Sequence, residues 1–146
     1  AKLVATAASV PTLVFTSRGA DPARVEALRG AGVEVVALPA RRGLLAWSRM
    51  LAELGRRDVA SVLVEGGGQV AAALLRGGHV DRLNLFLAPL LIGGDGRPVL
   101  GPLGVRRLRD ALALGTIEVR RFSGDLFLAT NVGSRHADEP ADEPDR

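Results

Sequence analysis

Short runs of apolar and β-branched residues alternate along the chain with stretches whose apolar residues recur at helical spacing. The strand-like runs lie at residues 12–16, 33–38, 59–64 and 83–88, and the helix-like stretches at residues 22–29, 44–54 and 69–75. Asp21 followed by Pro22 is typical of a helix start. Residues 116–122 and 125–130 flank Ser123-Gly124 and predict a closing β-hairpin.

This order of elements predicts an α/β fold. Strands that alternate with helices favour a mostly parallel sheet covered on both faces, and the hairpin makes that sheet mixed. We expect residues 1–132 to be folded as one domain. Residues 133–146 are acidic and repeat Ala-Asp-Glu-Pro, so they are expected to be a disordered tail.

Composition narrows the classes of protein that fit. Hydrophobic residues make up 47% of 146, which suits a folded domain. No apolar run reaches the roughly 18 residues that cross a bilayer, so no membrane contact is expected. The chain has no cysteine, which excludes disulfides and thiolate metal sites and agrees with a cytoplasmic location. His79 and His136 are far apart in sequence, and no metal site is predicted.

The net charge of +3 hides an asymmetry between the tail and the rest. The last 13 residues hold five acids and two arginines, leaving 17 basic and 11 acidic side chains before them. Such a body could attract a phosphorylated small molecule or nucleic acid. The arginines are dispersed and only five aromatics are available for base stacking, so nucleic acid is not predicted as a partner.

The sharpest local pattern is a glycine triplet between an apolar run and a helix. Residues 61–64 lead to Glu65-Gly66-Gly67-Gly68, and Gln69 and Val70 begin the helical spacing. Glycines there let the backbone approach a ligand closely, and the free amides of a helix start attract a diphosphate. Glu65, at the carboxyl end of the expected strand, could accept hydrogen bonds from a substrate.

Two other interpretations of this triplet stay open. It could be only a tight strand-to-helix turn. It also fits the Gly-x-Gly-x-x-Gly/Ala pattern of dinucleotide-binding folds, but the acid expected about 20 residues later is missing from residues 83–90. A second candidate binding segment is Thr16-Ser17-Arg18, whose hydroxyls and guanidinium could hold a phosphate such as the 2′-phosphate of NADPH. Its alternative is a plain polar loop after a strand.

Several blocks together resemble one known family. They are Leu63-Val64-Glu65-Gly66-Gly67-Gly68, the run at residues 72–83, Leu87-Ala88-Pro89-Leu90-Leu91-Ile92-Gly93-Gly94, and the hairpin at residues 119–128. Over residues 3–130 the chain is similar to the reductase domain of the bifunctional riboflavin-biosynthesis deaminase/reductase. That domain usually begins earlier, so the resemblance implies its C-terminal portion. Leu90 stands where the family usually has lysine.

The resemblance implies a dihydrofolate-reductase-like fold, NADPH as cofactor and a homodimer. The reaction would reduce 5-amino-6-(5-phosphoribosylamino)uracil, a phosphorylated pyrimidine, to its ribitylamino product. Glu65 would contact the substrate. A cis peptide between adjacent glycines would also be expected. The cofactor would be lined by the start of the helix and by the first strand end, namely Gly67, Gly68, Gln69, Val70, Ala71, Ala72, Ala73, Thr16, Ser17 and Arg18.

Alternative functions remain at this point. A related reductase of the same fold could act on a pterin or another aminopyrimidine. A non-catalytic nucleotide-binding or assembly domain would keep the same glycine-rich segment without the chemistry. A Rossmann dehydrogenase is disfavoured by the missing acid and by the closing hairpin.

Overall fold

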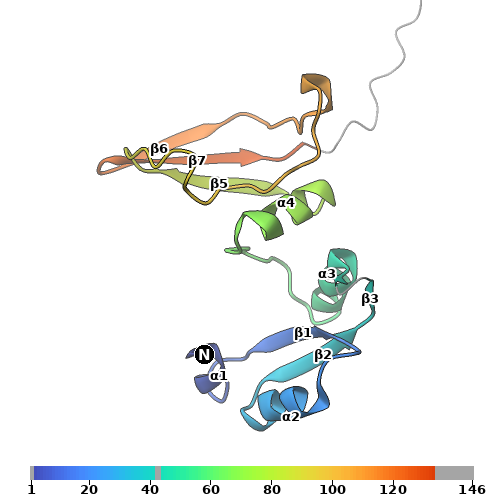
Figure 1. Cartoon of the computed structure of the whole chain (residues 1–146). Coiled ribbons are helices and arrows are strands. Elements are labelled where there is room, and N and C mark those ends of the chain that lie inside the picture. The colour runs from blue at the N-terminus through green and yellow to red at the C-terminus, as the bar shows by residue number, and fades with distance from the viewer. Residues whose placement is uncertain (1, 42–43, 134–146) are drawn as a thin grey trace, which may run out of the picture. The chain divides into compact units, whose positions relative to one another are not determined.

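The computed structural model describes residues 2–41 and 44–133. The chain divides into two compact units, Ala1–Val62 and Leu63–Arg146, each of which is described by itself (Figure 1). Both contain helices and strands, which confirms a mixed α/β protein. Of the predicted acidic tail at residues 133–146, all but Gly133 lies outside the described residues.

The first unit is built on a strand–helix–strand motif. Strand β1 (Leu13–Ser17) pairs in parallel with β2 (Glu34–Leu38), and helix α2 (Pro22–Gly30) connects them. The Asp21 carboxylate accepts a hydrogen bond from the Ala23 amide at 2.9 Å, as expected of a helix cap. A short helix α1 (Lys2–Ala5) precedes β1. The buried core contains Ala7, Val33 and Val35.

The end of the first unit differs from the prediction. Residues 44–45 were expected to begin a helix, but Leu44–Leu45 forms strand β4, which pairs antiparallel with β3 (Ala40–Arg41). Helix α3 therefore begins at Trp47 and ends at Gly55. The leucines fit the helical spacing, but their backbone is used by the strand pair, and local spacing carries no information about such a partner.

Arg57, just after α3, joins that helix to β2. Its guanidinium lies 2.7 Å from a Glu34 carboxylate oxygen and 2.8 Å from a Glu53 oxygen. The hydrogen bond from Arg57 lowers the pKa of the Glu34 carboxyl, and the same two bonds raise the pKa of Arg57. Glu53 is buried, so its pairing with Arg57 satisfies a charge that burial would otherwise penalise.

The second unit contains helix α4 (Gly68–Arg76), strand β5 (Arg82–Leu87), a short 3₁₀ helix η1 (Leu108–Asp110), and strands β6 (Glu118–Phe122) and β7 (Asp125–Asn131). The three strands form an antiparallel sheet in the order β5-β7-β6, with α4 drawn below it in Figure 1. Ala72, Leu74 and Leu75 of α4 and Ala129 of β7 are buried. The closing hairpin is thus confirmed.

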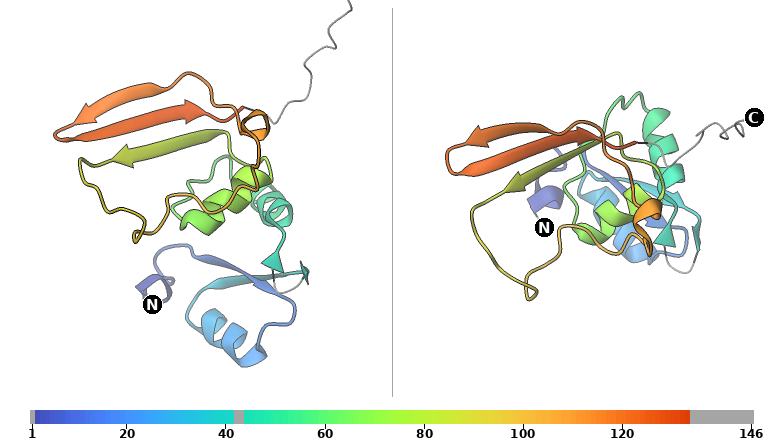
Figure 2. Two further views of the ribbon diagram at one scale, coloured as in Figure 1. Left: turned by 45° about the horizontal axis from the view of Figure 1, so that its top comes forward. Right: turned by 90° about the horizontal axis from the view of Figure 1, so that it is seen from above.

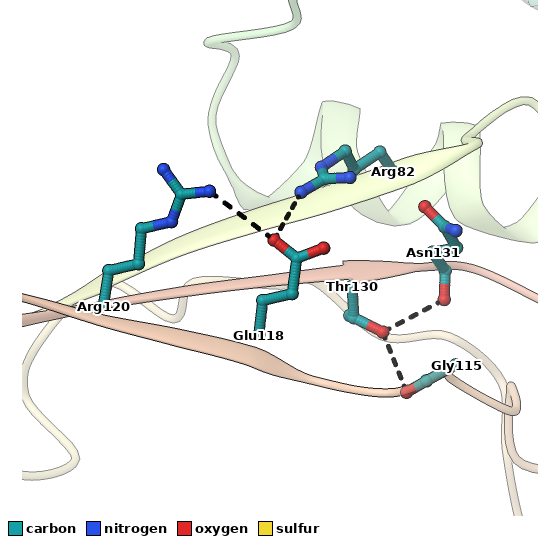
Figure 3. Close-up of polar contacts among 6 residues, drawn as sticks. All are labelled: Arg82, Gly115, Glu118, Arg120, Thr130 and Asn131. Carbon is teal, nitrogen blue, oxygen red and sulfur yellow. Dashed lines mark hydrogen bonds and ion pairs between the residues drawn. The ribbon is translucent and has the colours of Figure 1, made fainter.

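One face of this sheet carries aromatic and charged side chains. The Phe86 and Phe127 rings have centroids 5.0 Å apart, and Phe122 meets Phe127 edge-on at 6.2 Å. Glu118 pairs across the sheet with Arg82 at 3.2 Å and lies 3.9 Å from Arg120 (Figure 3). These charged groups are about half exposed, so the pairs stabilise the sheet little.

Two features of the predicted sheet are not found. Residues 59–64 were expected to form a buried strand, but they have no strand structure, and Val59, Val62, Leu63 and Val64 are 41–78% exposed. In the described residues, one strand pairing is parallel and three are antiparallel, so the mostly parallel sheet is not seen. An apolar run favours burial, which a strand can provide, but a strand also needs a neighbouring strand to hydrogen-bond with its backbone. Residues 59–64 form no such hydrogen bonds with another strand.

None of the described helices has the length and apolar character that crossing a membrane requires.

The Glu34–Arg57 pair predicts a pH dependence of stability. Because the folded-state pKa of Glu34 is lowered, its ionisation stabilises the fold above its ordinary pKa, and this contribution is lost as the pH falls through the folded-state value. Glu34→Gln should therefore lower the free energy of unfolding at neutral pH, and the difference from the unaltered protein should vanish in acid.

Urea titrations across the pH range measure this difference. Glu26→Gln is the matched control, because Glu26 is an exposed residue whose pairing with Arg29 spans 3.8 Å. A difference for Glu34→Gln that stays constant with pH would contradict the assigned role of its charge.

Candidate functional site

The candidate site begins where an extended segment enters α4. Residues 59–67 have no regular structure, and Gly67 precedes the helix with φ −66° and ψ 170°. The Gly67 carbonyl accepts hydrogen bonds from the amides of Val70 at 2.9 Å and Ala71 at 3.2 Å. Within the described residues, no backbone carbonyl accepts from the amides of Gly68 and Gln69. These amides carry the positive end of the helix dipole and suit an anionic ligand.

The three glycines before and at the start of α4 have different surroundings. A Cβ on Gly66 would lie 2.9 Å from a Val70 methyl carbon. A Cβ on Gly68 would lie 2.7 Å from the Pro98 carbonyl oxygen and 3.2 Å from the Gly101 nitrogen. A Cβ on Gly67 would meet nothing within 4 Å. Of the three, only Gly67 faces open space, so an incoming ligand can approach the helix start on its side.

The later residues of the predicted cofactor lining lie deeper in the helix. Val70, Ala71 and Ala73 are partly buried, and Ala72 has no exposed surface. Gln69 is exposed, and its side-chain oxygen lies 3.0 Å from where a Cβ on Gly101 would be. The surface that a ligand can reach is therefore concentrated at Gly67 and Gln69, and Ala72 contributes to packing.

Glu65 lies two residues before the helix cap and is exposed. Its carboxylate makes no hydrogen bond or ion pair with any residue of the described ranges, so it is available to a ligand. The backbone between adjacent glycines contains no cis peptide among residues 2–41 and 44–133, which corrects the expectation from the resemblance. In the same ranges, no group of three or more His, Asp or Glu side chains could hold a metal ion.

The other predicted binding segment, Thr16-Ser17-Arg18, lies in the first unit at the carboxyl end of β1. Ser17 pairs with Leu38 at the end of β2, and the Arg18 amide donates to the Leu38 carbonyl at 3.1 Å. Thr16 and Ser17 are half-buried and Arg18 is exposed. The structure thus fixes the backbone of this segment and leaves the guanidinium accessible.

Sequence reasoning missed one part of the site. The sequence patterns described above assign no role to residues 98–101, yet Pro98, Val99 and Gly101 lie against the first turn of α4. The Gly101 amide donates to the Gly68 carbonyl at 2.8 Å. The signal in the sequence was Gly101 itself, a residue without a side chain at a point of close backbone approach.

The fold is mixed α/β, and the glycine-lined start of α4 has free amides that suit an anion. The chain belongs to the family of the RibD C-terminal domain, whose model matches residues 1–128. This confirms the resemblance stated from the sequence.

Individual relatives agree with this membership. A 2,5-diamino-6-ribosylamino-4(3H)-pyrimidinone 5′-phosphate reductase of Aquifex aeolicus is 32% identical over 105 residues, 71% of this chain and 46% of the relative. The riboflavin biosynthesis protein RibD of Escherichia coli is 33% identical over 96 residues, 66% of this chain and 26% of RibD. The chain therefore spans less than half the length of these relatives.

The fold is shared with a solved structure of Acinetobacter baumannii RibD. The two superpose with a TM-score of 0.67 at 18% identity, over 83% of this chain and 37% of that one.

The different surroundings of Gly67 and Gly68 predict opposite responses to the same substitution. Gly68→Ser should lower the free energy of unfolding by about 1–3 kcal/mol, because its Cβ would press on the backbone of Pro98 and Gly101. Gly67→Ser should be neutral or slightly stabilising, because its Cβ meets open space and serine is a favourable helix cap. Urea unfolding of the matched pair checks both values, and equal destabilisation would contradict the described environment.

Proposed function

We propose that this chain is the C-terminal portion of an NADPH-dependent reductase of riboflavin biosynthesis. The substrate would be 5-amino-6-(5-phosphoribosylamino)uracil and the product its ribitylamino derivative. Membership of the RibD C-terminal domain family carries the proposal, and the open side of Gly67 supports it. Residues 1–132 would form this part of a dihydrofolate-reductase-like domain.

The residues at the start of α4 fit a dinucleotide. Gly67 leaves a space that any side chain would fill, and the Gly68 and Gln69 amides beside it have no acceptor in the described chain. A diphosphate placed there would receive these hydrogen bonds and the favourable helix dipole. When bound, NADPH supplies a hydride to an electrophilic carbon of the substrate's opened sugar.

Two further groups would set specificity. Glu65 is exposed and unpaired in the described chain, so its carboxylate can accept hydrogen bonds from substrate amino or hydroxyl groups. Thr16, Ser17 and Arg18 would bind the adenosine 2′-phosphate, since an exposed guanidinium beside two hydroxyls suits a dianionic phosphate. The protein would act by positioning and electrostatics, in the cytoplasm and as a homodimer.

A second candidate substrate is favoured by a specific observation. The relative from Aquifex aeolicus, and another from Methanothermobacter thermautotrophicus with 32% identity over 84% of this chain, are named as reductases of 2,5-diamino-6-ribosylamino-4(3H)-pyrimidinone 5′-phosphate. This compound differs from the first substrate on the pyrimidine ring. The same protein scaffold could therefore act before deamination of the ring rather than after it.

A direct assay tests the function. The purified protein is titrated with NADPH and NADH by calorimetry, and each of the two pyrimidines is then added while NADPH absorbance is followed. We expect NADPH to bind more tightly than NADH and to be consumed with one of the pyrimidines. Binding of NADPH without consumption would favour the nucleotide-binding or assembly alternative, and absence of binding would reject the reductase.

Gly67→Asp tests the proposed binding of a diphosphate at the start of α4. Aspartate is a favourable helix cap and its Cβ has space, so the fold should be retained. Its charge would repel a diphosphate, and the Kd for NADPH should rise at least about tenfold, which is about 1.4 kcal/mol. Gly67→Asn is the matched control for size without charge and should weaken binding less. An unchanged Kd for NADPH in both variants would contradict diphosphate binding at this position.

Glu65→Gln tests the substrate contact. The substitution replaces a charged hydrogen-bond acceptor by a neutral one, which should weaken substrate binding by about 1.5–3 kcal/mol. The KM for the pyrimidine should therefore rise about tenfold or more. The Kd for NADPH should stay unchanged. Steady-state kinetics and calorimetry on the same preparation separate the two quantities, and an equal loss of both would reject a substrate role for Glu65.

A further inference from the structure

The loop after β5 contacts α4 at two points along the helix. At the first turn, the Gly101 amide donates to the Gly68 carbonyl at 2.8 Å, and the carbonyl oxygens of Pro98 and Val99 lie beside Gly68. Gly101 is buried, although most of the surrounding loop is exposed. The loop backbone therefore rests directly on the helix start, and Figure 2 shows this segment passing beside α4.

The second contact comes from the other end of the helix. Arg76, in the last turn of α4, donates a guanidinium hydrogen bond to the Pro102 carbonyl. Gly68 and Arg76 are eight residues apart, which is about 12 Å along a helix axis. Side chains on a helix lean toward its N-terminus, so the long Arg76 side chain reaches back toward the residue next to Gly101. Adjacent loop residues are thus tied to both ends of α4.

We propose that residues 98–102 form one wall of the cofactor site and that Arg76 is the positioning residue that holds this wall in place. The inference rests on the proposed function. The carbonyl oxygens of Pro98 and Val99 occupy the Gly68 side of the helix start and disfavour an anion there. A diphosphate is therefore confined to the Gly67 side, where a Cβ would meet nothing within 4 Å.

This arrangement assigns Arg76 an effect on binding without direct contact with the ligand. Removing its guanidinium frees Pro102, and among the described residues the hydrogen bond from Gly101 to Gly68 is then the one that still ties the loop to α4. A loop that leaves its position uncovers the Gly68 side of the helix start, so a diphosphate is no longer confined to the Gly67 side. Ordering the loop again on binding costs conformational entropy, which weakens the cofactor.

The test compares Arg76→Ala with Arg76→Lys and Arg109→Ala in the purified protein. Arg109 lies in η1, is exposed and makes no hydrogen bond or ion pair in the described chain, so it controls for loss of one positive charge. The Kd for NADPH is measured by calorimetry well below the Tm of each variant. We expect Arg76→Ala to raise it about tenfold, Arg76→Lys to raise it less, and Arg109→Ala to leave it unchanged.

A purely structural role for Arg76 would give a different result, namely a lower Tm with an unchanged Kd in the folded protein, and that result would overturn the inference. If Arg76→Ala does not fold, Gly101→Ala replaces it, because its Cβ would lie 3.2 Å from the Gly68 carbonyl oxygen, a helix backbone atom, so that the loop must shift from the same position. Gly101→Ala should raise the Kd as well. If the unaltered protein binds no NADPH, the proposed function fails and the inference with it, whereas unchanged affinity in the variants rejects the inference alone.

Discussion

The structure of the second unit depends on one close approach between two backbone segments. Gly68 can begin α4 beside Pro98, Val99 and Gly101 only because it has no side chain, and the hydrogen bond between Gly101 and the Gly68 carbonyl requires that proximity. The contact fixes where a loop of more than ten residues lies relative to a helix start. It also determines which side of that helix start remains accessible, and so it links packing to the proposed chemistry.

The glycine triplet illustrates how adjacent identical residues can have separate functions. Gly66 accommodates Val70 of the following turn, Gly68 accommodates the loop, and Gly67 alone leaves space at the surface. A sequence pattern does not distinguish the three glycines, whereas the structure leaves space for a ligand only beside Gly67. The distances around each Cα indicate on which side of the helix start there is space for a ligand.

Much of the local structure could be predicted from the sequence, since it depends on nearby residues. Asp21-Pro22 marked the start of α2, and Ser123-Gly124 marked the hairpin, because caps and turns need particular residues at particular positions. Pairing between distant segments could not be predicted in this way. Residues 59–64 have the composition of a buried strand but pair with no other strand. Leu44–Leu45 was expected to lie in a helix and instead pairs with Ala40–Arg41. The loop against α4 was missed for the same reason.

The strand order of the second unit has a consequence for how the chain folds. Strand β7 lies between β5 and β6, and Arg82 pairs with Asn131 across a long stretch of intervening sequence. During synthesis, β5 therefore cannot pair with β7 until nearly all of the described chain has left the ribosome. The parallel pair of the first unit joins segments much closer in sequence, such as Leu13 and Glu34. Contacts of low sequence separation form faster, so we expect the N-terminal unit to be in place while the sheet is still incomplete.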